Sequence, residues 1–251
     1  MDTYTEIALA IRKAKKITVL TGAGISTASG IPDFRSRGGL YDNKVNVEDA
    51  LSEQQFQENP ELFWEYYKDI FNIKLTNQYE PNFGHTYLRE LEEGGKGVTI
   101  LTQNVDGLHR KAGNKHVYEL HGTIEKAYCP YCHQAYSLDD VLKGNVPRCL
   151  NDSTILKPDV VLFGGVVKHM EEAYEKTVES DLFLTMGTSL NVYPVRDIPS
   201  YVQHASRTTK IIINKEGTRS DYMFNHVIHE DINAALKKIK NAVENIKNAS
   251  Q

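Results

Sequence analysis

The sequence has few cysteines, no surplus of positive charge and no long apolar run. Only three of its 251 residues are cysteine, too few for a disulfide framework in a chain of this length, so we expect a reducing compartment. Lysine and arginine number 29 against 33 acidic residues, which leaves no basic field to attract nucleic acid or an anionic membrane. No apolar segment is long enough to cross a bilayer, and the start, Met1-Asp2-Thr3-Tyr4, does not have the pattern of a secretory signal. We therefore expect a cytoplasmic protein that binds neither nucleic acid nor membrane.

Strand-like and helix-like segments alternate along most of the chain. Its composition, with 40% hydrophobic and 25% charged residues, is typical of a soluble globular protein. We expect strands at residues 17–20, 98–101, 117–119, 160–163, 182–186 and 210–213, and helices at residues 5–14, 84–91, 168–180, 198–205 and 232–247. This alternation predicts an α/β protein with a Rossmann-like, doubly wound parallel sheet.

Two segments interrupt the alternation. Residues 38–80 are rich in helix-forming and aromatic residues, and residues 128–154 contain all three cysteines. We predict that these two insertions pack together as a smaller domain, part helical and part zinc-ribbon-like. The boundaries that we predict are 1–36, 81–124 and 157–251 for the Rossmann-like domain, and 37–80 and 125–156 for the smaller one.

A glycine-containing turn, Gly22-Ala23-Gly24, directly follows the expected strand at 17–20. Glycine has no Cβ to hold a ligand away, and buried parallel strands commonly deliver such turns to a phosphate. The same pattern also fits a plain strand-to-helix turn. Pro32 follows too closely for a long helix, so we expect a loop with Asp33, Phe34 and Arg35 beside a bound cofactor.

Polar residues follow two further strands in the same way. The run Gln103-Asn104-Val105-Asp106 comes after residues 98–101, and His121 comes after residues 117–119. Because ligands collect beyond the carboxyl ends of parallel strands, the three clusters can converge on one crevice. Each cluster has an ordinary alternative. Asparagine, aspartate and glycine favour turns, and a lone histidine is often a core or surface residue, although its unperturbed pKa of about 6.5 suits a general base.

In this order the motifs resemble those of the sirtuins, NAD-consuming protein deacylases, and the match to the short bacterial type extends from the first strand nearly to the C-terminus. The resemblance implies an enzyme that releases nicotinamide from NAD while the acyl-lysine carbonyl oxygen attacks the ribose, giving an alkylimidate. His121 would then act as the general base on a ribose hydroxyl. The products would be free lysine, nicotinamide and O-acyl-ADP-ribose. The implied partner is an acyl-lysine protein or peptide, and we expect the chain to act as a monomer.

The resemblance also assigns residues to the NAD site. It implies that Asn104 and Asp106 join His121 as catalytic residues. The NAD contacts that it implies are Gly22, Ala23, Gly24, Thr27, Ile31, Asp33, Phe34, Arg35, Gln103, Asn104, Val105, Asp106, His121, Gly187, Thr188, Ser189, Asn214, Glu216 and Asp231. Two of these positions have a second interpretation, Arg35 as a surface ion pair and Asp231 as the N-cap of the following helix.

The cysteines have the spacing of a metal site. Cys129 and Cys132 are spaced as in a zinc knuckle, and Cys149 lies at a distance suited to the second half of a zinc ribbon. Where the sirtuin pattern has a fourth cysteine, this chain has Asp152. Aspartate coordinates zinc but is a harder ligand than a thiolate, and His133 is a nearby substitute. A structural zinc site is one expectation, and a ribbon without metal is the other.

Sirtuins hold the acyl-lysine peptide as an added strand between two loops. The residues that the resemblance assigns to the substrate are Val161, Phe163, Gly164, Val192 and Tyr67. Two positions depart from the family pattern. Gly165 replaces the usual glutamate, and Ile70 replaces the arginine with which desuccinylating members hold a carboxylate. The resemblance therefore implies a neutral acyl group, in the simplest case acetyl.

Three other functions compete with deacylation. The same site could transfer ADP-ribose to protein or hydrolyse NAD. The presence of His121 argues against a transferase that has dispensed with the base. A non-catalytic NAD or ADP-ribose sensor is a second alternative, but it would have little need for His121 and Asn104 together. An ordinary dehydrogenase is the weakest, because the loop after Pro32 replaces the usual phosphate-binding helix and no acidic ribose ligand stands at the usual spacing.

Overall fold

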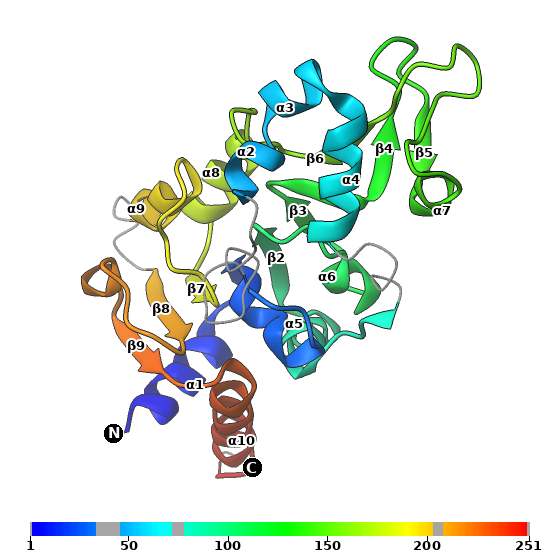
Figure 1. Cartoon of the computed structure of the whole chain (residues 1–251). Coiled ribbons are helices and arrows are strands. Elements are labelled where there is room, and N and C mark those ends of the chain that lie inside the picture. Colours follow the sequence, from blue (N-terminus) through cyan, green and yellow to red (C-terminus); the bar gives the residue numbers. More distant parts are fainter. Residues whose placement is uncertain (1, 34–45, 72–77, 203–207, 250–251) are drawn as a thin grey trace.

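The computed structural model describes residues 2–33, 46–71, 78–202 and 208–249 (Figure 1). Phe34 and Arg35, which the resemblance assigns to NAD, lie outside the described residues. The helices are α1 (Thr3–Lys13), α2 (Val47–Ala50), α3 (Glu53–Glu58), α4 (Pro60–Ile70), α5 (Phe83–Glu93), α6 (Leu108–Lys111), α7 (Leu138–Leu142), α8 (Met170–Val178), α9 (Ile198–Tyr201) and α10 (Ile232–Ala249). The strands are β1 (Lys16–Thr21), β2 (Gly97–Thr102), β3 (Val117–Glu119), β4 (Gly122–Tyr128), β5 (Ala135–Ser137), β6 (Lys157–Val160), β7 (Leu182–Met186), β8 (Thr209–Asn214) and β9 (His226–His229).

Six parallel strands form the main sheet, in the order β3-β2-β1-β7-β8-β9. In the central strand β1, Val19 pairs with Ile100 of β2 on one side and with Leu184 of β7 on the other. Every residue of β1 after Lys16 is buried, as expected for a strand with helices on both faces. The strand order reverses between β1 and β7. In open sheets of this kind, ligands bind beyond the carboxyl ends of the strands at such a reversal.

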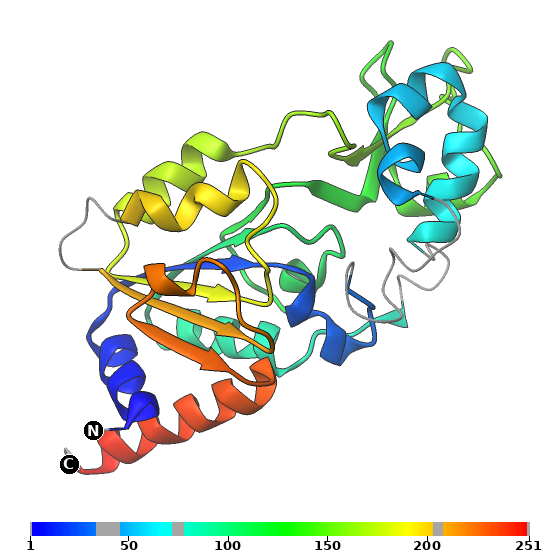
Figure 2. The same cartoon turned by 60° about the vertical axis from the view of Figure 1, so that its left-hand side comes forward.

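Alternate residues of these strands face two separate hydrophobic cores. Val19 and its neighbours on one face pack against α1, α5 and α10, and Leu20 on the other face belongs to a core with α8 and α9. Figure 2 shows these two helix layers on opposite sides of the sheet. The predicted Rossmann-like, doubly wound sheet is therefore confirmed.

A third hydrophobic core lies apart from the main sheet. It joins α2, α4 and α7 to the antiparallel sheet β5-β4-β6, and its centre is Trp64, whose indole N–H donates to the Leu156 carbonyl oxygen at 2.8 Å. The two insertions thus pack together beside the carboxyl ends of the main strands (Figure 2). The domain boundaries given above stay a prediction.

The prediction of a strand at residues 160–163 is wrong. The strand in this part of the chain is β6, Lys157–Val160, and it pairs antiparallel with β4 in the small sheet. The apolar run that suggested a strand continues as loop, and Phe163 forms only an isolated bridge to Ser52. None of the helices formed by the described residues is long and apolar enough to cross a membrane.

Candidate active site

The glycine turn after β1 is pressed against the end of β7. A Cβ on Gly22 would lie 2.8 Å from the Gly187 carbonyl oxygen, and a Cβ on Gly24 would lie 2.7 Å from the Gly187 Cα. The Gly24 N–H donates to that same carbonyl oxygen at 2.9 Å. Two short 3-10 turns, at Ala23–Ile25 and Thr27–Ser29, take the place of a long helix. The turn therefore presents backbone at the point where the sheet order reverses.

The segment after β2 folds back onto this turn. The Asn104 side-chain amide donates to the Gly22 carbonyl oxygen and to the Ser26 hydroxyl, each at 3.2 Å. The Ser26 hydroxyl in turn donates to Asp106 at 2.6 Å, whose other oxygen accepts from the Leu108 N–H at 2.9 Å. Burial raises the pKa of Asp106, and these two hydrogen bonds act against that rise. Ser26 was not predicted as a site residue, because the prediction for this turn was based on its glycines.

His121 lies where the chain passes from β3 in the main sheet to β4 in the small one. Its Nδ1 is 3.1 Å from the Gln103 carbonyl oxygen. A carbonyl oxygen only accepts, so Nδ1 carries the proton and Nε2 keeps its lone pair. The Gln103 side chain donates to the Thr188 hydroxyl at 2.9 Å, which ties this strand end to β7. Burial lowers the pKa of His121 below its ordinary value, so the ring is a neutral base at pH 7.

A small cavity of about 60 Å³ opens between the two parts of the molecule. Its lining residues come from the glycine turn, the segment after β2 and the insertions: Ala23, Ser26, Ile31, Pro32, Phe71, Tyr79, Asn104, Val105, Asp106 and Ile124. Asp33 follows Pro32 and is half-buried. Phe71 and Tyr79 had no signal in the sequence, because they lie far from every strand end. The cavity combines aromatic walls with an amide and a carboxylate, which suits a planar ring that carries a polar amide.

The remaining residues that are predicted to contact NAD lie along the same edge of the sheet. Gly187 and Thr188 are buried against the glycine turn, while Thr27 and Ser189 are exposed. Asn214 is the last residue of β8 and Glu216 follows it, and the Asn214 side-chain amide donates to the Glu216 carbonyl oxygen at 2.7 Å. Asp231 accepts from the Ala234 N–H at 2.9 Å. The capping interpretation of Asp231 is therefore confirmed, and its contact with NAD stays a prediction.

The predicted peptide-binding residues are of two kinds. Gly164 and Val192 are exposed, and a Cβ on Gly164 would meet nothing within 4 Å among the described residues. Phe163 donates its N–H to Leu51 and accepts at its carbonyl oxygen from Glu53, both at 3.0 Å. The Val161 N–H donates to the His121 carbonyl oxygen at 2.8 Å. The backbone of Phe163 is therefore already paired within the chain, and the position at which a peptide strand would be added stays a prediction.

Tyr67, the remaining predicted substrate residue, lies inside the third core. It is 1% exposed, and its ring is 4.9 Å from that of Phe71, which lines the cavity. The Tyr67 hydroxyl has no hydrogen-bond partner among the described residues. Tyr67 therefore packs against Phe71, which lines the cavity, and is not itself a lining residue.

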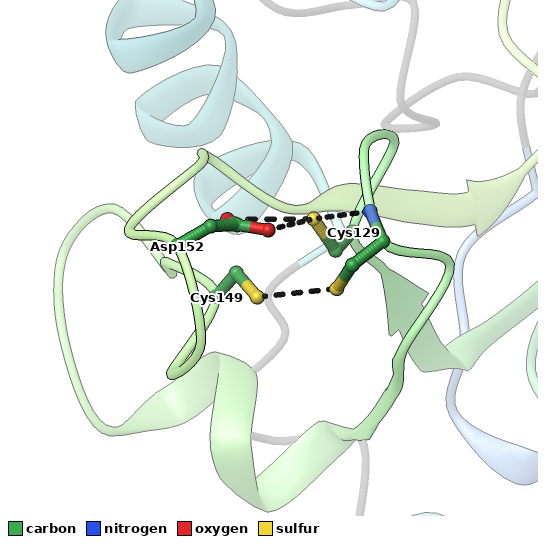
Figure 3. A group of neighbouring side chains, drawn as sticks. Cys129, Cys149 and Asp152 are labelled. Carbon is green, nitrogen blue, oxygen red and sulfur yellow. Dashed lines mark hydrogen bonds between the residues drawn. The ribbon is translucent and has the colours of Figure 1, made fainter.

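The three cysteines and Asp152 form one cluster, in which Figure 3 labels Cys129, Cys149 and Asp152. Their ligand atoms all lie within 4.8 Å of one another. The two sulfur atoms of Cys132 and Cys149 are 3.5 Å apart, close to the ~3.8 Å expected for two thiolates on one tetrahedral zinc ion. His133, the substitute considered above, is not part of the metal-binding group formed by the described residues.

Backbone amides support the ligand geometry of the cluster. The N–H groups of Tyr131 and Cys132 donate to the Cys129 sulfur, and the Asn151 N–H donates to the Cys149 sulfur, each at 3.4 Å. The two halves of the ribbon therefore have the same turn, with Asp152 in the place of the last thiolate. This cluster is compatible with a closed, structural zinc site, which leaves no position open for a substrate.

We expect the substitution Asp152→Cys to strengthen zinc binding, because it replaces a hard carboxylate by a softer thiolate. Zinc release to a colorimetric chelator should then require more chelator for the variant than for the unchanged protein. Asp139→Cys, which lies in the first turn of α7 outside the cluster, should change nothing. Loss of zinc at the same chelator concentration from all three proteins would show that residue 152 does not bind the metal, and purified protein without zinc would support a ribbon without metal.

If His121 is the general base that the resemblance implies, the pH dependence of activity should report its protonation. As the pH falls through the pKa of His121, the ring is protonated and its function as a base is lost, so the rate falls on the acid side. Because burial lowers that pKa from 6.5, the acid limb of kcat/KM should have its midpoint below pH 6.5. The substitution His116→Ala, at an exposed histidine, should leave the profile in place. An acid limb centred above pH 7 would contradict a buried neutral base.

Comparison with known proteins places these features in a family. The model of the Sir2 family matches residues 22–194. The chain is 51% identical over 245 residues to NAD-dependent protein deacetylase 2 of Geobacillus kaustophilus (strain HTA426), covering 97% of this chain and 99% of that protein. A solved structure described as "Sir2-p53 peptide-NAD+" is similar, with a TM-score of 0.83 and 32% identity over 96% of this chain and 98% of that one. Another, "Sir2 bound to acetylated peptide", has a TM-score of 0.82 and 30% identity, with the same coverage of both chains.

Proposed function

This chain belongs to the Sir2 family, and from that membership and the site geometry we propose how its residues carry out the reaction. The protein is an NAD-dependent protein deacetylase. NAD and an acetyl-lysine peptide are its two substrates. The observation that supports the residue assignment is the junction of three strand ends. Asn104 and Asp106 contact Gly22 and Ser26 of the turn after β1. His121 is hydrogen-bonded to the carbonyl oxygen of Gln103, the residue before Asn104.

The cavity fits the nicotinamide end of NAD. Its aromatic and aliphatic walls suit a flat ring, and Asn104 and Asp106 supply polar groups for a carboxamide and a ribose. When bound, NAD supplies a glycosidic bond whose cleavage releases nicotinamide and leaves an electrophilic ribose carbon. Asn104 is held by two hydrogen bonds before the substrate arrives, so its orientation costs little at the moment of reaction. Asp33 would contact NAD at this end of the site, and the NAD contacts expected of Phe34 and Arg35 stay predictions.

His121 acts as the general base in this proposal. Its Nδ1 proton is committed to the Gln103 carbonyl oxygen, so Nε2 is the atom that takes a proton from a ribose hydroxyl. The lowered pKa keeps Nε2 available at neutral pH. The acyl-lysine oxygen would bond to the ribose carbon as nicotinamide leaves, and the freed hydroxyl oxygen would then attack the acyl carbon. Addition of one water with departure of the lysine amine would leave free lysine and O-acyl-ADP-ribose.

The coupling of NAD cleavage to the peptide separates deacetylation from its alternatives. Nicotinamide release should require an acetyl-lysine peptide, and mass spectrometry should find one O-acetyl-ADP-ribose for each deacetylated lysine. Nicotinamide release at the same rate without peptide would indicate an NAD hydrolase. ADP-ribose attached to protein would indicate a transferase, and NAD binding without turnover would indicate a sensor.

The acyl group that the enzyme removes should be neutral. Ile70 lies where an arginine would hold a carboxylate, and it is 5% exposed in the third core, so a succinyl carboxylate would have no cation from this position. On matched peptides, kcat/KM for acetyl-lysine should exceed that for succinyl-lysine by at least about tenfold, the loss expected for one unpaired buried charge. A preference for succinyl would overturn this assignment.

Three further features belong to the proposal. The peptide adds as a strand beside Gly164 and Val192, using main-chain hydrogen bonds that do not depend on side chains. The two domains have the boundaries given above, with the active site between them. The protein acts as a monomer in the cytoplasm, in line with a sequence that has only three cysteines.

A further inference from the structure

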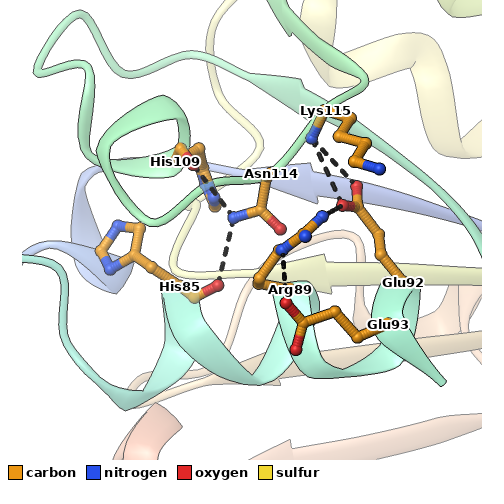
Figure 4. A network of polar contacts seen from close by, with 7 residues as sticks. All are labelled: His85, Arg89, Glu92, Glu93, His109, Asn114 and Lys115. Carbon is orange, nitrogen blue, oxygen red and sulfur yellow. Dashed lines mark hydrogen bonds and ion pairs between the residues drawn. The ribbon is translucent and has the colours of Figure 1, made fainter.

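Two buried histidines lie behind the NAD site and have no part in the reaction proposed above. His85 of α5 and His109 of α6 are 0% and 2% exposed. Their ring centroids are 4.7 Å apart, with an interplanar angle of 62°. Neither residue lines the cavity. Figure 4 shows the two side chains with Asn114 between their backbones.

His109 joins the two loops that make up the site. Its Nε2 lies 3.0 Å from the hydroxyl oxygen of Thr21, the last residue of β1 and the neighbour of Gly22. His109 itself lies in α6, the four-residue helix that begins directly after Gly107. This one hydrogen bond therefore connects the start of the glycine turn to the segment that carries Asn104 and Asp106.

His85 holds the far end of the glycine turn through Asn82. The His85 Nδ1 accepts from the Asn82 N–H at 3.3 Å, so the proton of His85 is on Nε2 and the ring is neutral. The Asn82 side-chain amide donates to the Ile25 carbonyl oxygen at 2.7 Å and to the Ser29 hydroxyl at 2.9 Å. The glycine turn is thus fixed at both ends by residues of this buried layer.

Asn114 connects the backbones of the two histidines. Its side-chain amide donates to the carbonyl oxygens of His85 and His109, each at 3.1 Å (Figure 4). The charged groups drawn in Figure 4 belong to Arg89, Glu92, Glu93 and Lys115, and they form their own ion pairs and hydrogen bonds. The histidine layer is therefore a neutral hydrogen-bonded unit.

Retaining two imidazoles here has a cost. Among the described residues, the His85 Nε2 and the His109 Nδ1 have no hydrogen-bond partner, and burying a polar atom without a partner is unfavourable. Apolar rings of the same shape would avoid that penalty. An imidazole brings a hydrogen bond that an apolar ring cannot make, between His109 and Thr21 and from the Asn82 N–H to His85.

We infer that His85 and His109 are positioning residues for NAD, which hold the glycine turn and the segment at 103–108 at a fixed separation. This inference rests on the proposed function, since it assigns NAD to the space between those two segments. The histidines act through Thr21 and Asn82 and do not touch the substrate. Loosening them should weaken NAD binding and leave peptide binding unchanged.

The test compares NAD affinity, measured by isothermal titration calorimetry, across variants of the Thr21–His109 bond. His109→Phe and Thr21→Val each remove the bond and keep the shape, and each should weaken NAD binding about two- to tenfold, the worth of one hydrogen bond. The double variant should bind NAD no more weakly than the weaker single variant, because both remove the same bond. His109→Gln, whose amide can reach the position of Nε2, should restore most of the affinity. In turnover assays, KM for NAD should rise while KM for the peptide stays constant.

Leu88→Ala is the matched control, because Leu88 is a fully buried residue of α5 that does not line the cavity. It should lower the melting temperature without weakening NAD binding. The inference is overturned if folded His109→Phe and Thr21→Val bind NAD like the unchanged protein, if their effects add, or if Leu88→Ala weakens NAD binding as much for the same loss of stability. If His109→Phe does not fold, the pair Thr21→Val and Thr21→Ser decides the question, since only serine keeps the hydroxyl. An unchanged protein that binds NAD but does not deacetylate would contradict the proposed function and leave this inference standing.

Discussion

Replacing His121 by alanine should lower kcat by about 10²- to 10⁴-fold, the usual contribution of a positioned general base. The physical reason is specific to this ring. Its Nδ1 donates its proton to the Gln103 carbonyl oxygen at 3.1 Å, so Nε2 is the ring atom that can take the ribose proton. Burial lowers the pKa of His121, which keeps Nε2 unprotonated at neutral pH. Steady-state kinetics with NAD and an acetyl-lysine peptide measure the loss.

The affinity for NAD should change little in the same variant, because the contacts made by Asn104, Asp106 and the glycine turn remain. His116→Ala, at an exposed histidine, is the matched control and should keep full activity. If His121→Ala retained most of its turnover, His121 would not be the base. If it failed to fold, His121 would instead be a core residue.

Gly122→Ala should destabilise the protein by about 2 to 5 kcal/mol, the combined cost of backbone strain and overpacking. Gly122 has a φ of +77°, and an added Cβ would lie only 1.7 Å from the Asp159 carbonyl oxygen. The only relief is to move β4 away from β6, where Gly122 pairs with Val160. Since His121 is the preceding residue, the movement should also displace the base. Urea denaturation and the deacetylase assay measure the two effects.

Gly95→Ala separates backbone strain from the steric clash. Gly95 has a φ of +87°, but an added Cβ would meet nothing within 4 Å among the described residues. It should cost only the strain of a positive φ, about 1 kcal/mol, and leave activity intact. Equal losses of stability in the two variants would show that the contact with Asp159 does not matter.

The buried strands of the main sheet were predictable from sequence because burial on both faces gives continuous apolar runs. The strand at 182–186 was predicted with the observed bounds, and the one at 17–20 lacked one residue at each end. The strand β9 was missed, since it is four residues long at the edge of the sheet and Val227 is 37% exposed. The apolar run at 160–163 misled because its backbone does not pair with one neighbouring strand: the N–H of Val161 donates to His121 and the N–H of Phe163 donates to Leu51.

The site was predictable where motifs follow strand ends and was not where it depends on distant packing. Asn104, Asp106 and the glycine turn come together as expected. Ser26, the residue that links them, is one hydroxyl among several and has no pattern of its own. Phe71 and Tyr79 reach the cavity only because the insertion packs over it. The histidine layer was likewise invisible, since His85 and His109 are 24 residues apart in sequence and become neighbours only through packing between α5 and α6.

A crystal structure of the protein with NAD and an acetyl-lysine peptide would test the central claim most directly. The proposed reaction requires His121 Nε2 within hydrogen-bond distance, about 2.6 to 3.2 Å, of a hydroxyl of the nicotinamide ribose, with Asn104 beside the same sugar. A ribose bound out of reach of Nε2, or nicotinamide bound away from the cavity lined by Ser26 and Asp106, would contradict it.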